Sequence, residues 1–392
     1  MAQQTQYTTA QAPLKAQLTR QGQLNSAGDA RALYLKLFSG EMFKGFQHES
    51  IARDLVMKRT LKNGKSLQFI YTGRTTAEFH TPGNSILGNS DGAPPVAEKT
   101  ITCDDLLISS AFVYELDETL AHFELRGEIS KKIGYALAEK YDRLIFRAIA
   151  KGARLASPVG KTSSFREPGG TQIQVGSGTG TDGDAYDAGK LVTAFYDAAA
   201  ALDEKGVSGT GRVAVLNPRQ YYALIQDIGS NGLINRDVQG TALQSGNGII
   251  EIAGIKIYKS MNIPFLSKHG VAYGGTTGET SPSNLGSHVG TAIADGRASV
   301  DGLNNNYGNA TDFNKSCGLI FQKEACAVVE AIGPQVQVTS GDISVVYQGD
   351  VILGRLAMGA DFLNPAAAVE LVAGIDVSSN YNNTAVSNAS FS

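Results

Sequence analysis

Two glycine-rich stretches have the residue types from which nucleotide-binding loops are built. Residues 178–183 read Gly-x-Gly-x-x-Gly between a strand-like segment and a helix, which is the order of a dinucleotide site. The acidic residues about 20 positions on, Asp203 and Glu204, lie inside the predicted helix rather than at the end of a second strand. Residues 183–190 end in Gly-Lys, but five residues separate the glycines where a phosphate loop has four. We therefore predict loops here and no nucleotide site.

The other candidate catalytic and metal-binding motifs lack the flanking elements or ligands that such sites need. Residues 88–92 match the Gly-x-Ser-x-Gly pattern of a serine nucleophile, but they lie in a polar loop with no strand before them and no helix after them. Asp182, Asp184 and Asp187 have the beginning of a calcium-loop spacing, yet Tyr186 stands where the next ligand is needed. The five histidines are spread one per segment. We predict no catalytic, cofactor-binding or metal site, and no enzyme activity.

The composition narrows the classes of protein further. The 392 residues carry a formal net charge of −3, so no strongly basic body is present to bind nucleic acid by neutralising phosphates. The three cysteines form no Cys-x-x-Cys pair, which indicates reduced thiols. No apolar run approaches the ~18 residues that a membrane span needs. Residues 1–28 lack the apolar core of a signal peptide, and we expect a soluble, non-secreted protein.

The best hairpin prediction brings a basic cluster together. Extended stretches at residues 51–61 and 66–72 flank residues 62–65, Lys-Asn-Gly-Lys, and Asn-Gly suits both left-handed positions of a type I′ turn. A two-stranded arm of this kind is only marginally stable alone. We therefore predict that its strands settle on an adjacent subunit. Acidic groups there are expected to meet the basic cluster Lys58, Arg59, Lys62 and Lys65, which with the turn residues Asn63 and Gly64 forms the candidate subunit interface.

The strongest helix prediction covers residues 117–151. Asp117 is the predicted N-cap, and Gly152 is the predicted glycine just beyond the last turn. About 34 residues at 1.5 Å each would make a rod of about 50 Å. The apolar stripe recurs every four residues and consists of Leu125, Ile129, Ile133, Leu137, Tyr141, Ile145 and Ile149. A coiled coil alternates steps of three and four, so this stripe favours a helix that lies across a sheet.

Shorter elements follow this helix. Gly206 ends the first of them, and Asn217 is the predicted N-cap of the last helix. The predicted elements are a helix at 188–204, a strand at 212–217, a helix at 218–228 and two strands within 248–258. Residues 267–315 carry nine glycines and almost no large apolar side chains, which indicates an insertion at a surface. The mixture of helices and strands predicts an α+β fold class.

An ordered set of motifs resembles one protein family. The set comprises the strand excursion with its Asn-Gly, the long helix directly after it, Asn-Pro-x-x-Tyr-x-x-Leu at 217–224, and Ile-x-Gly-Ile-x-Ile at 252–257. It resembles the major capsid proteins of tailed bacteriophages, which have the fold named after phage HK-97. Further matches are Gly-Lys-Ser-x-Gln-Phe at 64–69, Ala-Met-Gly at 357–359 and Pro-x-Ala at 365–367. These are similar to the capsid proteins of T-seven-like short-tailed phages (podoviruses), including those that infect cyanobacteria.

The resemblance implies a division of the chain. The implied parts are an N-terminal arm at 1–48, an extended loop (E-loop) with flanking strands at 49–114, a P domain with the long helix and a Gly-rich loop at 115–211, an A domain at 212–335 with its insertion at 267–315, a return to the P domain at 336–373, and a tail at 374–392. The first matching motif is Gly-Asp-x-x-x-Leu-x-Leu-Lys at 28–36, and the stretch before it is too short for a fused scaffolding domain. A separate scaffolding protein is therefore implied.

The function that the resemblance implies is structural. Copies of the chain would form hexamers and pentamers of an icosahedral head shell, with a portal protein and packaged double-stranded DNA as partners and without cofactor or membrane. The expected location is the virion, and the host cytoplasm during assembly. Lys15 and Arg20 would face the genome by weak non-specific contact or clamp a neighbour. The alternative is an encapsulin-like shell of the same fold that encloses protein cargo; a nucleotide-binding enzyme is the third reading.

Overall fold

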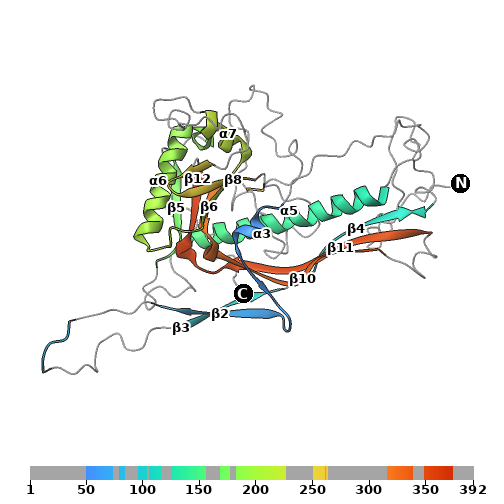
Figure 1. Ribbon diagram of the computed structural model, residues 1–392, viewed down its shortest axis with the longest axis horizontal. Coiled ribbons are helices and arrows are strands. Elements are labelled where there is room, and N and C mark those ends of the chain that lie inside the picture. The colour runs from blue at the N-terminus through green and yellow to red at the C-terminus, as the bar shows by residue number, and fades with distance from the viewer. Residues whose placement is uncertain are drawn as a thin grey trace, which may run out of the picture. The chain divides into compact units, whose positions relative to one another are not determined.

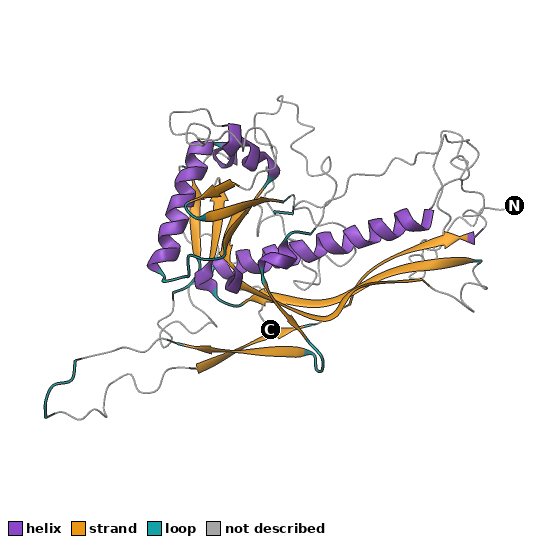
Figure 2. Cartoon of the chain, viewed as in Figure 1, coloured by secondary structure: helices purple, strands orange, loops and turns teal. Residues whose placement is uncertain are grey.

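The structure is a computed structural model, and it describes most of the chain between residues 50 and 373. The described ranges are 50–73, 79–83, 96–103, 106–115, 125–155, 168–176, 182–226, 250–260, 262–263, 316–338 and 348–373. The predicted arm at 1–48, the insertion at 267–315 and the tail at 374–392 lie outside these residues. Helices and strands are mixed throughout the described chain, as the α+β prediction requires (Figures 1 and 2).

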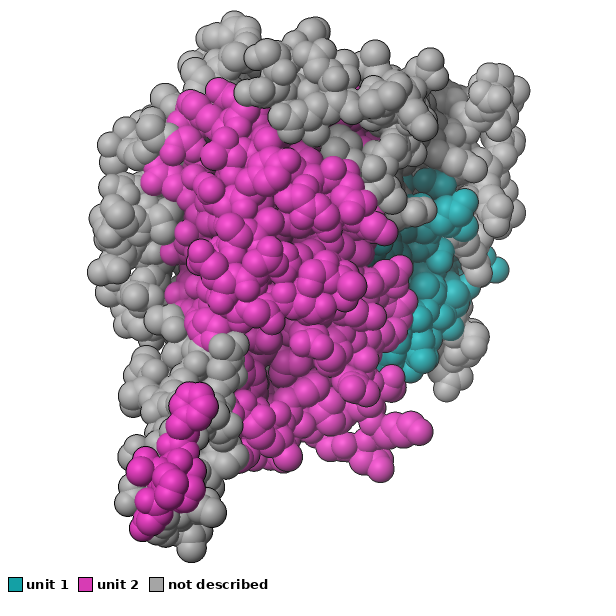
Figure 3. Space-filling view, turned by 60° about the vertical axis from the view of Figure 1, so that its left-hand side comes forward, with its two compact units in different colours: residues 1–50, 105–140, 331–358 teal, residues 51–104, 141–330, 359–392 magenta. Residues whose placement is uncertain are grey.

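The chain divides into two units, coloured separately in Figure 3. Unit 1 contains residues 1–50, 105–140 and 331–358, and unit 2 contains residues 51–104, 141–330 and 359–392. The divisions fall inside the long helix α5 (Leu125–Ala153) and inside two long strands, β10 (Cys326–Val338) and β11 (Gly349–Phe362). Each of these three elements therefore contributes residues to both units.

Unit 1 is built from one helix on one sheet. Strand β4 (Leu106–Tyr114) pairs antiparallel with β11, from Gly349 opposite Tyr114 to Ala357 opposite Leu106. Ile133 and Leu137 of α5 pack against Val113 and Ile352 of these strands. A Cβ atom at Gly354 would lie 2.4 Å from Cγ2 of Ile133, so only glycine allows this close approach of the helix to the strand.

A six-stranded sheet forms the core of unit 2. Its strand order is β5-β12-β9-β6-β8-β7. The strands are β5 (Thr171–Val175), β6 (Arg212–Leu216), β7 (Ile250–Ile252), β8 (Ile255–Lys259), β9 (Ser316–Gln322) and β12 (Ala368–Ala373). Every residue of β6 and β12 is buried, which explains why their sequences are apolar on both faces, apart from Arg212 and Glu370, rather than alternating. Helix α6 (Ala188–Glu204) packs on β5, and α7 (Pro218–Gln226) lies beside β8 (Figure 2).

The helix predictions hold in their positions but not in all of their caps. The buried stripe of α5 is confirmed from Ile133 to Ile149, and α6 has the predicted bounds. Gly152 lies inside α5 rather than after it, and its lack of a side chain makes room for Phe362, whose Cβ would lie 2.9 Å from a Cβ at this position. Asn217 holds the predicted N-cap position of α7, because its carbonyl accepts the N–H of Tyr221, but its side chain makes no capping hydrogen bond. Its backbone N–H donates instead to Oε1 of Gln220, 3.0 Å away. The Asp117 cap lies outside the described residues.

The predicted hairpin at residues 51–72 is wrong. Residues 52–55 form a short helix, α3 (Ala52–Leu55), and β1 (Met57–Thr60) pairs in parallel with β10. Strand β2 (Ser66–Thr72) pairs instead with β3 (Val96–Thr102) in a separate two-stranded sheet. Residues 61–65 therefore connect two different sheets. Of the two predicted turn residues, Asn63 and Gly64, only Gly64 has a positive φ, at 97°. The predicted left-handed conformation of Asn63 is therefore wrong as well.

The type I′ signature occurs elsewhere, between β7 and β8. Ile252 pairs with Ile255, and the two residues between them, Ala253 and Gly254, have φ values of 52° and 74°. The remaining described elements are short 3-10 turns, η2 (Asp182–Tyr186), η5 (Lys323–Ala325) and η6 (Pro365–Ala367). No helix among the described residues is long and apolar enough to cross a membrane.

Candidate assembly surfaces

The two-stranded sheet β2–β3, which we call the ribbon, buries one of its faces. Leu67 and Phe69 of β2 and Ile101 of β3 alternate with exposed neighbours along their strands. They pack with Leu61 and Val329 into a small apolar cluster of unit 2. This inward face therefore fixes the ribbon to its own subunit at the end where β2 begins and β3 ends.

The outward face of the ribbon stays uncovered. Ile70 is 77% exposed and Val96 is 63% exposed, and the register places Ile70 opposite Glu98 and Val96 opposite Thr72. Because these positions alternate with the inward residues, Ile70 and Val96 lie diagonally on the same face. Fully burying an Ile or Val side chain stabilises a protein by about 1.5–3 kcal/mol. Because Ile70 and Val96 are mostly exposed, a single subunit gains little of this stabilisation from them.

A sheet face in unit 1 is also uncovered. Leu106 and Ile108 of β4 are 46% and 57% exposed. They lie on the face opposite to Val113 and Leu107, which pack beneath α5. The register adds Leu353 of β11 to this outward face, because it pairs with Ser110. Large apolar side chains from paired strands thus lie exposed on the ribbon and on this sheet, where Val336 and Val338 of β10 are exposed as well.

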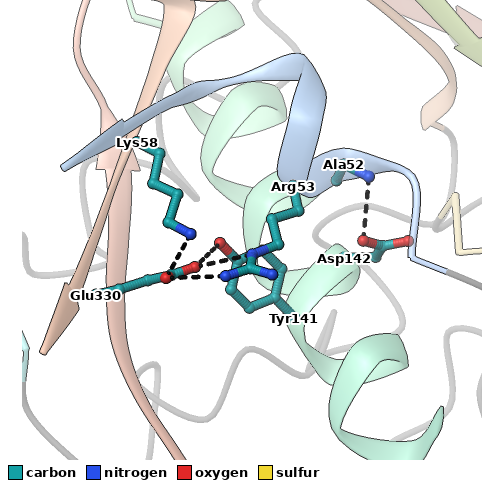
Figure 4. Close-up of polar contacts among 6 residues, drawn as sticks. All are labelled: Ala52, Arg53, Lys58, Tyr141, Asp142 and Glu330. Carbon is teal, nitrogen blue, oxygen red and sulfur yellow. Dashed lines mark hydrogen bonds and ion pairs between the residues drawn. The ribbon is translucent and has the colours of Figure 1, made fainter. Parts of the chain in front are cut away.

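A buried carboxylate, Glu330, anchors the segment that leads into the ribbon (Figure 4). The Arg53 guanidinium donates to both of its oxygens at 3.2 Å, and Lys58 Nζ lies 2.8 Å from Oε2. Tyr141 of α5 donates its hydroxyl proton to Oε1 at 2.8 Å. Burial opposes ionisation of Glu330, whose side chain is 5% exposed, but the hydrogen bonds from Arg53, Lys58 and Tyr141 hold the pKa of its carboxyl below the usual value.

A second carboxylate fastens the beginning of the same segment. Asp142, the next residue of α5, accepts the backbone N–H groups of Ile51 and Ala52 at 3.1 and 3.2 Å. The first N–H groups of a helix have no acceptor within the helix itself. Here the side chain of Asp142, from another helix, accepts them and caps α3. Asn262 donates to the same carboxylate at 3.4 Å. Residues 51–60 are thereby fixed at both ends on α5 and β10.

The other strand of the ribbon has an anchor of its own. Lys99 of β3 makes a 2.7 Å ion pair with Asp361, and its Nζ lies 3.8 Å from the ring centre of Phe362. The backbones of β3 and β11 also approach closely at Thr102 and Gly359, where a Cβ on the glycine would overlap the Thr102 carbonyl. These contacts, together with those of Glu330, hold the ribbon at its base.

The basic cluster is divided by the structure. Lys58 pairs with Glu330 of its own chain, whereas Arg59 and Lys62 are exposed. The carbonyl of Lys65 accepts the N–H of Cys103. The cluster lies at the base of the ribbon rather than at its tip, because the strands are joined at the other end by residues 73–95 (Figure 1). Lys15 and Arg20 lie outside the described residues.

The rejected chemical motifs have ordinary structural partners where they are described. Asp184 makes a 2.6 Å ion pair with Lys190, and Asp187 caps α6 by accepting the N–H of Lys190. Residues 84–95 and 177–181 lie outside the described chain. Within that chain, no group of three or more potential ligands is close enough to hold a metal ion. All three cysteines are free thiols, and burial raises the pKa of Cys326.

Sequence reasoning did not identify the buried carboxylates as anchors. Glu330 interrupts the apolar run of β10, and Glu370 interrupts that of β12. Glu370 accepts two bonds from Arg154, at 2.6 and 2.7 Å, with both side chains at most 1% exposed. A single acidic residue inside a continuously apolar strand was the available signal, because a carboxylate is buried only when it is paired.

Comparison with known proteins identifies the fold and the family. The chain is 27% identical over 364 residues to the major capsid protein of Escherichia phage T7, covering 90% of this chain and 96% of that protein. It is 30% identical to a chain of the cyanophage P-SCSP1u capsid structure, with a TM-score of 0.66 and coverage of 91% and 98%. A chain of the mature capsid of bacteriophage PhiM1 shares the fold at 14% identity, with a TM-score of 0.62 and coverage of 92% and 98%.

The resemblance seen in the sequence motifs is therefore confirmed, and with it the HK-97-type fold class. The family model of the Gp10A-like major capsid proteins matches residues 68–372, which is well over half of the chain. This family is structural and not a class of enzymes. The chain belongs to the Gp10A-like family of major capsid proteins.

Proposed function

We propose that copies of this chain, with a separate scaffolding protein, build the icosahedral head shell of a tailed double-stranded DNA phage. The observation that carries this proposal is the family match over residues 68–372, which makes the chain a major capsid protein. The ribbon supports it independently. A two-stranded sheet that leaves Ile70 and Val96 exposed is suited to a subunit whose surface is completed by its neighbours.

The ribbon is the part that we assign to contact between copies. Its outward face carries Ile70 and Val96, and the open sheet face of unit 1 carries Leu106 and Ile108. If the ribbon of one copy lies on that face of the next, both apolar surfaces are removed from water at once. Four partly exposed aliphatic side chains of this kind would contribute several kcal/mol per contact, at about 1.5–3 kcal/mol for each one fully buried.

The division of the chain follows the same reading. Residues 1–48 are the arm, 49–114 the E-loop region with the ribbon, 115–211 and 336–373 the P domain, and 212–335 the A domain. Portal protein and packaged DNA are the further partners that we propose, with host cytoplasm as the place of assembly. Lys15 and Arg20 give at most weak, salt-sensitive attraction to DNA, because two charges per subunit release few counterions.

The test is co-expression of the full chain with the scaffolding protein of its phage, followed by electron microscopy and sedimentation. We expect closed shells that package DNA when the portal and packaging proteins are supplied. A protein that stays monomeric under every assembly condition would overturn the proposal. Shells that exclude DNA and instead recruit a tagged enzyme would favour the encapsulin-like alternative. Saturable NAD or ATP binding by calorimetry would support the enzyme reading, and we expect none.

A further inference from the structure

Helix α6 has one face without a partner among the described residues. Its exposed positions recur at helical spacing, whereas Leu191, Phe195 and Leu202 are buried beneath them. Three carboxylates and a half-exposed tyrosine lie on this surface, which we call the acidic face. It consists of Thr193, Tyr196, Asp197, Ala200, Asp203 and Glu204.

The placement of these carboxylates is unfavourable within the subunit. Asp203 and Glu204 stand in the last turn of α6, where the helix dipole disfavours negative charge, and that turn contains no basic residue. Arg212 forms a 2.7 Å ion pair with Asp203, although the Asp203 side chain is still 70% exposed. Asp197 and Glu204 have no ion pair within the described chain. At Glu204 the preference of the helix end is therefore broken without an ion pair among the described residues, and a broken local rule of this kind is typical of a functional surface.

Two cations of the basic cluster, Arg59 and Lys62, also lack an opposite charge among the described residues. Lys58 is held by Glu330, but its neighbour Arg59 points to the other side of β1, as alternation along a strand requires. Arg59 and Lys62 are exposed and make no ion pair in the part of the chain that the structure describes. The backbone that carries Arg59 is fixed in place, because residues 51–60 are anchored on α5 and β10, and Lys62 follows directly after Leu61, whose N–H donates to the carbonyl of Glu330.

The two surfaces have similar spacing, and they make no ion pair with each other among the described residues of one copy. Asp197 and Glu204 are seven residues apart on a helix, or about 10 Å along its axis. Arg59 and Lys62 are three residues apart, at most about 10 Å in extended chain. Helix α6 packs on β5 and α7, whereas β1 pairs with β10. Different patches of one chain that complement each other give a head-to-tail contact, which closes into a ring when repeated by rotation.

We infer that Arg59 and Lys62 of one copy dock on the acidic face of α6 of the next copy, against Asp197 and Glu204. Tyr196 lies beside Asp197 on this face and offers its ring to the incoming guanidinium or ammonium. The inference rests on the proposed self-assembly and adds a polar contact to the apolar one that the ribbon makes. Every subunit supplies both surfaces, so the contact repeats around each capsomer.

Charge reversal with rescue tests this contact in the full chain, co-expressed with the scaffolding protein of its phage. The first variant carries Arg59→Glu and Lys62→Glu, the second carries Asp197→Lys and Glu204→Lys, and the third carries all four changes. We expect each double variant to lower the yield of sedimenting shells at least tenfold at physiological salt. The fourfold variant restores the original net charge and is expected to recover the yield to within about twofold.

The matched control is Lys131→Glu with Lys132→Glu, two exposed lysines of α5 that change the net charge equally. Circular dichroism of the soluble subunits checks that every variant folds, as expected for exposed positions. The inference is overturned if both double variants assemble normally, if the fourfold variant assembles no better than they do, or if the control loses as much yield. The unaltered chain is assembled in parallel. Its failure would contradict the proposed function itself, whereas a failed rescue would contradict only this contact.

Discussion

The six-stranded sheet and the ribbon, both in unit 2, differ in what completes them. In the sheet, every residue of β6 and β12 is buried, and even charged side chains such as Arg154 and Glu370 find their partners inside the subunit. The ribbon buries one face and leaves Ile70 and Val96 in water. On the proposed function, we expect the sheet to fold within one copy and the ribbon to gain stability from another.

The largest effect on the isolated subunit is expected from Arg154→Met. It leaves Glu370 buried without its cation, which costs about 3–5 kcal/mol of unfolding free energy when one member of such a pair is removed. Thermal unfolding of the soluble subunit measures the loss. The double variant Arg154→Met with Glu370→Leu is expected to recover at least half of it, because no unpaired charge remains. A single variant within about 1 kcal/mol of the parent would show that the sheet does not depend on this pair.

Changes on the ribbon are expected to act in the opposite way. Ile70→Asp should leave the unfolding free energy of the subunit within about 0.5 kcal/mol, because the side chain is already exposed. Shell yield should fall more than tenfold, since a charge would then be buried at the contact between copies. Ile70→Val is the matched control and should assemble normally. Sedimentation of assembly reactions is the measurement, and normal shells from Ile70→Asp would reject the ribbon as an interface.

The Glu330 anchor gives a pH dependence. Its carboxyl has a pKa below the usual value, so its stabilising contribution is complete above the pKa of an unfolded Glu, about 4.3, and is lost as pH falls through the lower folded value. Glu330→Gln should lose about 1–3 kcal/mol near neutral pH and flatten the acid limb of the stability profile. Thermal unfolding from pH 6 to pH 3 measures both. Parallel curves for the two proteins would contradict this role of Glu330.

A smaller effect than that of the Arg154–Glu370 pair is expected at Gly64, where φ is 97° and a Cβ would meet no other atom. Gly64→Val is therefore disfavoured by backbone conformation alone, by about 1–2 kcal/mol. Helical content by circular dichroism should stay intact, while shell assembly or shell stability falls because the base of the ribbon is redirected. Gly209→Val, at an exposed glycine without positive φ, is the control. Equal behaviour of the two variants would remove any role for this turn.

Some predicted elements match the structure to the residue, whereas the predicted strand pairing at residues 51–72 is wrong. The difference has a physical reason. Helix α6 has local signals at both ends, Asp187 as its cap and Gly206 after its last turn, and its bounds were predicted correctly. Residues 62–65 also have a clear local signal, but strand pairing is decided by distant residues. The pairing of β1 with β10 joins positions about 270 residues apart, as in Met57 opposite Ala327. No turn motif contains that information.

The candidate surfaces show the same limit. The basic cluster was recognised from its composition, but the partner of Lys58 is Glu330, which is distant in sequence. Exposure of Ile70 and Val96 follows from alternation only once the β2–β3 register is known. The family resemblance was recognisable because ordered motifs survive at about the level of identity found with the phage T7 protein, 27%.

Hydrogen–deuterium exchange of the free subunit and of assembled shells tests the central claim most directly. Peptides covering 66–72 and 96–102 report on the ribbon, and a peptide covering 316–322 reports on β9 of the sheet. We expect exchange in the ribbon peptides to slow at least tenfold on assembly, because a neighbour covers their exposed face, while exchange in β9 changes little. Ribbon peptides that exchange equally fast in subunit and shell would contradict the claim that another copy completes the ribbon.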